Sequence, residues 1–175
     1  WSAGSIAWCT NEGIIAGTGD GTFQPTGELT GLAFAKMLLT ALGYDAEIEN
    51  LVGPSWAINT AKLAVTAGLT QGLDISLTAP MTREQAAQMA LNAEQAIMVE
   101  YGTSIGVSVG DANVTIAGSK ASPVVNLGTE RIKNDGYMQF AEQYADKLVL
   151  DATAHDDLGR PADEWVYNNA LIGTY

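Results

Sequence analysis

The chain is poor in cations, cysteine and histidine, and each shortage excludes a class of function. Its 175 residues include 8 Lys and Arg against 20 Asp and Glu, so its net charge is −12. Nucleic-acid binders and polybasic membrane-surface modules need a basic face, so we expect neither partner. One cysteine, Cys9, and one histidine, His155, exclude an intrachain disulfide, a CxxC zinc or redox site and a His-rich metal centre. We expect Cys9 to be a small buried apolar residue.

Long hydrophobic runs are also missing. No apolar run approaches the roughly 20 residues that a membrane helix needs, so we expect no membrane insertion. Hydrophobic residues still make up 47% of the chain, which is enough to bury a core. The sequence starts at Trp1 inside an amphipathic segment, without a start methionine or signal peptide, so we expect part of a longer or processed chain. The composition suits a secreted bacterial protein and a cytosolic one nearly equally.

An internal repeat organises the first hundred residues. Residues 1–17 align with residues 56–72, and residues 29–37 align with residues 81–89. The offset falls from 55 to 52 between these blocks, which a three-residue deletion in a loop explains. The matched pairs are Trp1 with Trp56, Gly13 with Gly68, Gly17 with Gly72, Thr30 with Thr82 and Met37 with Met89. Two unrelated helical stretches would not keep these residues in order across a gap.

Each copy is predicted to be a helix, a loop and a second helix. Gly13 and Gly68 follow the first helices and are typical of a left-handed residue just past a helix end. The loop of the first copy contains Asp20 and Gly21, a strong signal for a tight turn. The second helix of the second copy begins with a capping box in which Thr82 and Gln85 exchange hydrogen bonds.

Thr30 caps the corresponding helix of the first copy without such a partner. The apolar faces expected on the second helices are Phe34, Met37, Leu38 and Ala41 in the first copy, and Ala86, Met89, Ala90 and Ala93 in the second. The helix of the second copy is expected to run on toward Val99.

The last 74 residues change character. Alternating apolar residues over 105–109 and 113–116, on either side of a turn, predict a β-hairpin, and residues 124–125 predict a third strand. Tyr137, Phe140, Tyr144 and Leu148 recur at helical spacing and predict a helix over 135–149. Residues 164–167 and 170–175 predict two short strands around an Asn-Asn turn.

Three motifs of the first copy occur in a fixed order: Gly-Ile-Ile-x-Gly at 13–17, Gly-Asp-Gly-Thr-Phe-x-Pro at 19–25 and Leu-Thr-x-x-x-Phe-Ala-Lys-Met-Leu at 29–38. Together they resemble the S-layer homology (SLH) repeat, which residues 1–44 match closely and residues 51–97 less closely. The resemblance implies an α+β chain from a Gram-positive bacterium of the Firmicutes. Its expected parts are two SLH-type helix-loop-helix repeats (1–45 and 51–97, within 1–101) and a small extension (102–175) with β-hairpins and one helix, packing on the repeats.

The resemblance also implies a function. SLH repeats anchor secreted proteins to the bacterial cell wall or S-layer by binding a secondary cell-wall polysaccharide, often acidic or pyruvylated, without catalysis or cofactor. An arginine at the start of the second helix pairs with the acidic group, and the helix dipole adds positive charge. In this sequence the matching ligand-binding residues are Arg83, Thr82, Trp56, Trp1, Asp20 and Gly21.

The sequence departs from the family pattern in ways that support an alternative. Gly31 stands at the arginine position of the first repeat, the second repeat lacks the Asp-Gly-Thr-Phe turn, and no third repeat occurs in 102–175. A structural spacer or protein-assembly domain that keeps the fold without strong glycan binding therefore stays open. Its partners would be further domains of the same chain or a second copy, joined through a hairpin edge.

Other chemistries find less support. Residues 17–21 lack the strand-loop-helix order and the basic partner of a nucleotide loop. The acidic residues around His155 (Asp151, Asp156, Asp157, Asp163 and Glu164) fit no EF-hand spacing. We interpret them as a solvated loop rather than a Ca²⁺ site. A Ser/His/Asp triad would have to use the single histidine without a nucleophile elbow, and no pair of carboxylates is singled out for glycoside hydrolysis.

Overall fold

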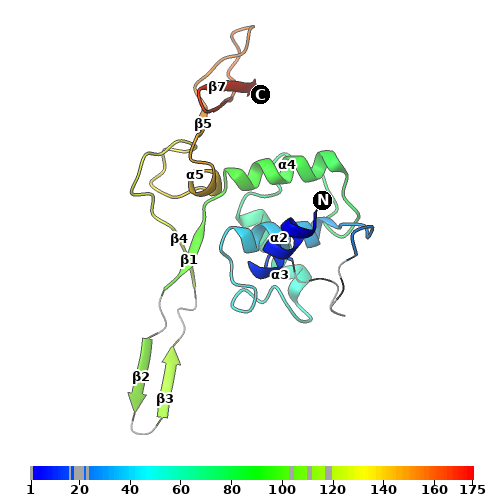
Figure 1. Ribbon diagram of the computed structural model, residues 1–175, viewed down its shortest axis with the longest axis vertical. Coiled ribbons are helices and arrows are strands. Elements are labelled where there is room, and N and C mark those ends of the chain that lie inside the picture. Colours follow the sequence, from blue (N-terminus) through cyan, green and yellow to red (C-terminus); the bar gives the residue numbers. More distant parts are fainter. Residues whose placement is uncertain are drawn as a thin grey trace.

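The computed structural model describes residues 2–15, 17, 22, 24–102, 105–109, 112–116 and 120–175, with 105–109 and 112–116 described by their backbone. The predicted site residues Trp1, Asp20 and Gly21 lie outside these ranges. A group of helices occupies one side of the molecule, and a long β-ribbon and a small C-terminal sheet extend in opposite directions beside it (Figure 1). This mixture of helices and strands confirms the predicted α+β class.

The helices are α1 (Ala3–Asn11), α2 (Gly31–Ala41), α3 (Trp56–Thr66), α4 (Arg83–Glu94) and α5 (Phe140–Tyr144). The strands are β1 (Val99–Tyr101), β2 (Ile105–Val109), β3 (Ala112–Ile116), β4 (Ala121–Pro123), β5 (Leu148–Asp151), β6 (Glu164–Tyr167) and β7 (Ala170–Thr174). β1 pairs with β4, β2 pairs with β3, and β5, β6 and β7 form a three-stranded antiparallel sheet.

Helices α2 and α4 begin in the same way. The Thr30 hydroxyl accepts a hydrogen bond from the Ala33 N–H, and the Thr82 hydroxyl accepts one from the Gln85 N–H, both at 3.2 Å. Only in α4 is the bond reciprocated, because the Gln85 side chain accepts the Thr82 N–H at 2.8 Å. The predicted caps, including the one-sided cap of α2, are confirmed.

The starts of these two helices lie side by side, joined by a β-bridge between Thr30 and Pro80. The Met81 N–H donates to the Leu29 carbonyl at 2.9 Å. Gly31 is buried in this contact, and a Cβ at that position would lie 3.0 Å from both Cα and Cδ2 of Leu77. The first repeat therefore has no space for the arginine that the resemblance expects there.

A single core joins α2, α3, α4 and the loops between them. Its buried members are Ala35, Leu39, Leu42, Leu51, Ala64, Leu69, Met89, Ala93 and Ala96. In α4, Met89 and Ala93 match the predicted face. In α2 the predicted face is wrong by about one position, because α2 lies between α3 and α4 and buries Leu32, Ala35 and Leu39. Phe34 and Leu38 pack at the margin of that core.

Helix α1 contributes no buried residue. Cys9 is half-buried, so the expectation that it is a buried core residue is wrong. The glycine that follows α1 has the predicted left-handed conformation, with φ of 71° at Gly13 and 79° at its counterpart Gly68.

The extended segments around Met98, Val124 and Met138 meet beside the core, where a closed ring of backbone hydrogen bonds joins them. The Met98 N–H donates to the Met138 carbonyl at 2.8 Å, the Met138 N–H donates to the Val124 carbonyl at 2.8 Å, and the Val124 N–H donates to the Met98 carbonyl at 2.9 Å. Each segment is thus paired with the other two. The Val99 N–H donates to the Leu42 carbonyl at 2.9 Å, which ties this ring to the end of α2.

This ring explains two errors in the predicted elements. Helix α4 ends at Glu94 rather than continuing toward Val99, because residues 97–99 belong to the ring and to β1. The predicted helix over 135–149 is only the five residues of α5. Tyr137 instead bridges to Val125, and Leu148 pairs with Tyr167 in the C-terminal sheet.

The C-terminal part has a small core of its own, made of Ile132, Ala141 and Trp165. Leu91 of α4 packs against it, while Phe140 of α5 packs against the helical core. The predicted turn at Asn168 and Asn169 is confirmed by positive φ angles of 50° and 63°.

A buried carboxylate fixes the loop before α5. Glu142 accepts hydrogen bonds from the Asn126 side chain (2.6 Å) and from the backbone N–H groups of Arg131 (2.6 Å) and Ile132 (2.9 Å). The Arg131 guanidinium donates in turn to the carbonyl of Ala145 at 2.7 Å. These bonds hold the loop that follows β4 in a fixed position beside α4.

The junction of α2 with β1 generates a stability prediction. Gly43 has φ of 100°, and a Cβ there would collide with the Val99 carbonyl oxygen. We expect Gly43→Ala to lower the free energy of unfolding by about 3 kcal/mol or more, since backbone strain and a steric clash add together. The matched control is Gly53→Ala, which has φ of 70° and no heavy atom within 4 Å of the added Cβ.

We expect Gly53→Ala to lower the free energy of unfolding by about 1–2 kcal/mol, because it adds backbone strain without a steric clash. Urea denaturation of both variants measures the difference. Equal losses would show that α2 and β1 do not meet closely at this point.

Candidate functional site

Trp56 is half-buried and lines a groove of about 440 Å³ between α2, the start of α3 and the segment after α1. The other lining residues are Gly13, Ile14, Gly17, Ala33, Lys36, Met37, Ala46, Leu51, Val52 and Gly53. Among the lining residues that the structure describes there is one cation, Lys36, and no carboxylate, in a chain of net charge −12. We call it the Trp56 groove.

The other two described site predictions, Thr82 and Arg83, do not line this groove. The Thr82 hydroxyl is used as the cap of α4. Arg83 occupies the first turn of α4 with its side chain exposed, and it has no ion-pair partner among the described residues. Trp56 and Arg83 therefore do not line a common groove.

A second groove, of about 510 Å³, lies beside α4. Three of its lining residues, Gly72, Gln85 and Gln88, stand at the repeat positions of Gly17, Ala33 and Lys36 in the Trp56 groove. Its aromatic side chain is Tyr175, which comes from the end of the chain. Asp74 and Glu84 also line it, so its charge is opposite to that of the Trp56 groove.

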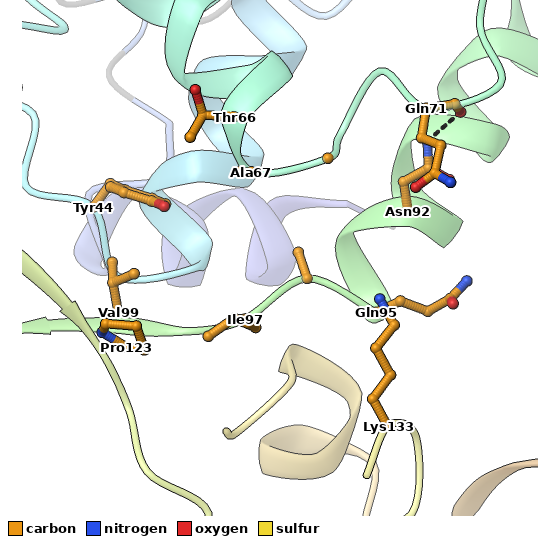
Figure 2. Close-up of a pocket in the computed structure, with 12 residues that line it drawn as sticks. Tyr44, Thr66, Ala67, Gln71, Asn92, Gln95, Ile97, Val99, Pro123 and Lys133 are labelled. Carbon is orange, nitrogen blue, oxygen red and sulfur yellow. Dashed lines mark hydrogen bonds between the residues drawn. The ribbon is translucent and has the colours of Figure 1, made fainter. Parts of the chain in front are cut away.

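A third cavity, of about 310 Å³, lies where the ends of α3 and α4 meet strands β1 and β4 (Figure 2). Its lining comes from five separate segments of the chain: Tyr44, then Thr66–Gly68 with Gln71, then Asn92 with Gln95–Ile97 and Val99, then Pro123, and finally Lys133. These segments are far apart in the sequence, so their residues form no motif that could be recognised. The cavity could therefore not be predicted from the sequence.

The acidic loop around His155 is closed by hydrogen bonds and an ion pair within the loop itself. Asp156 accepts backbone hydrogen bonds from Leu158 and Arg160 at 2.9 Å each, and it forms an ion pair with the Arg160 side chain. These bonds from Arg160, and secondarily from Leu158, lower the pKa of the Asp156 carboxyl. Across the part of the chain that the structure describes, no group of His, Cys, Asp and Glu side chains is arranged to hold a metal ion.

Comparisons with known proteins bear on the helical part. The family model of the S-layer homology domain matches residues 1–35. This part of the chain is therefore similar to an S-layer homology domain. The chain is also 33% identical over 99 residues to an endoglucanase from Bacillus sp. (strain KSM-635), a match that covers 53% of this chain. No solved structure matches the chain significantly.

The SLH match confirms the predicted family and agrees with the predicted Gram-positive origin. An SLH domain is a non-catalytic anchoring module of the cell surface, so the predicted location at the cell wall or S-layer is confirmed. The chain spans about a tenth of the length of the endoglucanase that it resembles. None of the described helices is both long enough and apolar enough to cross a bilayer.

The start of α4 generates a prediction that separates capping from ligand contact. We expect Thr82→Ala to lower the free energy of unfolding by about 1 kcal/mol, because the Gln85 N–H loses its capping partner, while Thr82→Ser stays near wild type. Chemical denaturation measures both variants. If Thr82→Ala is as stable as wild type, the hydroxyl is not the cap and remains available to a ligand.

Proposed function

We propose that this SLH module attaches to the cell surface by binding a wall polysaccharide, with the Trp56 groove as the main contact. The observation that carries the proposal is the pairing of a half-buried Trp56 with Lys36 in a groove to which the described residues contribute no carboxylate. An indole ring offers a flat apolar face, which suits the C–H surface of a sugar ring. A lysine ammonium provides a compact positive charge for an acidic substituent.

Arg83 supports the same function from a second position. Its exposed guanidinium stands in the first turn of α4, where the helix N-terminus adds partial positive charge. A forked cation in such a place binds a carboxylate well. A polysaccharide is long enough to contact both positions, so the separation of Arg83 from the Trp56 groove does not conflict with the proposal.

The division of the chain is part of the proposal. We assign residues 1–45 and 51–97 to two repeats and residues 102–175 to an extension. Positive φ at the matched pairs Gly13 and Gly68 and Gly17 and Gly72 supports this assignment. The matched threonine caps and the corresponding lining positions of the two grooves support it as well.

One observation favours the alternative of a spacer or assembly domain. Gly31 is packed against Leu77, so the start of α2 offers neither a cation nor an open surface to a glycan. A module in which the start of α2 is inaccessible to a ligand would keep the SLH fold with fewer ligand contacts. The alternative predicts no retention on cell walls and a discrete oligomer in solution.

Retention on purified bacterial cell walls tests the two functions. We expect wild type to be retained, and we expect Trp56→Ala, Lys36→Ala and Arg83→Ala each to weaken binding by about tenfold, the effect of losing one charge-assisted or aromatic contact. Lys147→Ala is the matched control, since Lys147 is exposed and lines none of the three cavities.

Walls stripped of polysaccharide by acid extraction provide the second control and should retain nothing. If wild type is not retained, glycan binding is wrong, and a discrete oligomer on sizing would support the alternative. Equal retention of Arg83→Ala and wild type would exclude Arg83 from the contact.

A further inference from the structure

The cavity at the ends of α3 and α4 is lined by a cation, although the chain as a whole is strongly acidic. The chain has 20 acidic residues, yet none of the described residues that line this cavity is acidic, and one of the 8 cations, Lys133, is among them. Lys133 comes from the extension, whereas most of the lining belongs to the helical part. The cavity therefore exists only where the extension meets the helical part.

One wall is held rigid by hydrogen bonds. The Asn92 amide donates to the carbonyls of Leu69 (2.9 Å) and Gln71 (2.8 Å), and its oxygen accepts a bond from the Gln88 side chain at 3.0 Å. These bonds fix the loop after α3 against α4. The shape of the cavity is consequently set before any ligand arrives, which lowers the entropic cost of binding.

Other polar groups at the cavity are uncommitted. Within the described part of the chain, the side chains of Gln95 and Lys133 and the hydroxyl of Tyr44 have no hydrogen-bond partner. Figure 2 shows Lys133 extending from its loop toward Gln95, with Tyr44 on the other side of the cavity. Burial and the nearby Glu49 raise the pKa of Tyr44, so its phenol stays a hydrogen-bond donor.

The remaining lining selects the kind of ligand. Ala67, Ala96, Ile97, Val99 and Pro123 provide an apolar floor. Helices α3 and α4 both end at this cavity, and the partial negative charge at their C-terminal ends favours hydrogen-bond donors and disfavours a bare anion. A ligand that suits all three features has an apolar face, several hydroxyl donors and a single acidic group.

We propose that this cavity binds one acidic sugar residue. The ring lies on the apolar floor beside Tyr44, the carboxylate pairs with Lys133, and hydroxyl or acetamido groups bond to Gln95 and the helix ends. A volume of about 310 Å³ is at the small end of ligand cavities, so it takes one sugar unit rather than a stretch of glycan. The extension thereby becomes part of the binding surface. This inference rests on the proposed glycan-binding function, although it concerns a site apart from the Trp56 groove.

Two sugars that differ by one acidic substituent test the proposal. N-acetylmuramic acid is N-acetylglucosamine with an added lactyl carboxylate, so titration of the 175-residue chain with each, followed by NMR or calorimetry, isolates the contribution of the charge. We expect wild type to bind the acidic sugar about tenfold more tightly than the neutral one, as a charge-assisted hydrogen bond provides. We expect Lys133→Ala to abolish that preference while leaving the neutral sugar unchanged.

The controls separate this site from the proposed function. Lys147→Ala and Trp56→Ala should both keep the preference for the acidic sugar. Gln95→Ala should weaken the binding of both sugars to the same extent. Lys133 is exposed, so its replacement should not disturb the fold. Far-UV circular dichroism of each variant checks this expectation. Failure of wild type to bind N-acetylmuramic acid, or an unchanged preference in Lys133→Ala, overturns the inference. Loss of wall retention in Trp56→Ala with the sugar preference intact leaves both proposals standing. Retention that is insensitive to Trp56 contradicts only the main groove.

Discussion

The structure depends on the ring of backbone hydrogen bonds among Met98, Val124 and Met138. Each of these residues donates to one neighbour and accepts from the other, so removing any one segment would leave an N–H of one neighbour and a C=O of the other without a partner. Met98 also packs against the helical core, and the Val99 N–H bonds to the end of α2. Helices, ribbon and C-terminal sheet are therefore positioned by one junction, and the cavity beside Ile97 and Pro123 is built directly on it.

Local signals in the sequence predicted the helix ends well. Thr30, Thr82, Gly13 and Gly68 act within a few residues of themselves, so their hydrogen bonds and φ angles follow from neighbours that the sequence shows directly. The periodicity of residues 137–148 was misleading for the opposite reason. Tyr137 bridges to Val125 and Leu148 pairs with Tyr167, and such distant partners outweigh helical spacing.

The candidate sites follow the same rule. Trp56 was predicted from the repeat, and it does line a groove, but Lys36 was missed because its importance depends on the segment after α1 that lies across from it. Thr82 carries out the capping that its own motif describes. The cavity with Lys133 could not be predicted, because its walls are brought together by the hydrogen-bonded ring and by Glu142, which holds the loop preceding Lys133. Contacts made across the whole chain leave no short pattern to find.

The burial of Gly31 has a consequence for how this module can change over evolutionary time. Its neighbours include the Cα and carbonyl oxygen of Leu77 as well as the Leu77 side chain, so no smaller residue at 77 would by itself admit an arginine. An arginine at position 31 would also require a rearranged backbone around Leu77. The starts of α2 and α4 therefore cannot change independently of each other, because a substitution at one has to be accommodated by the other.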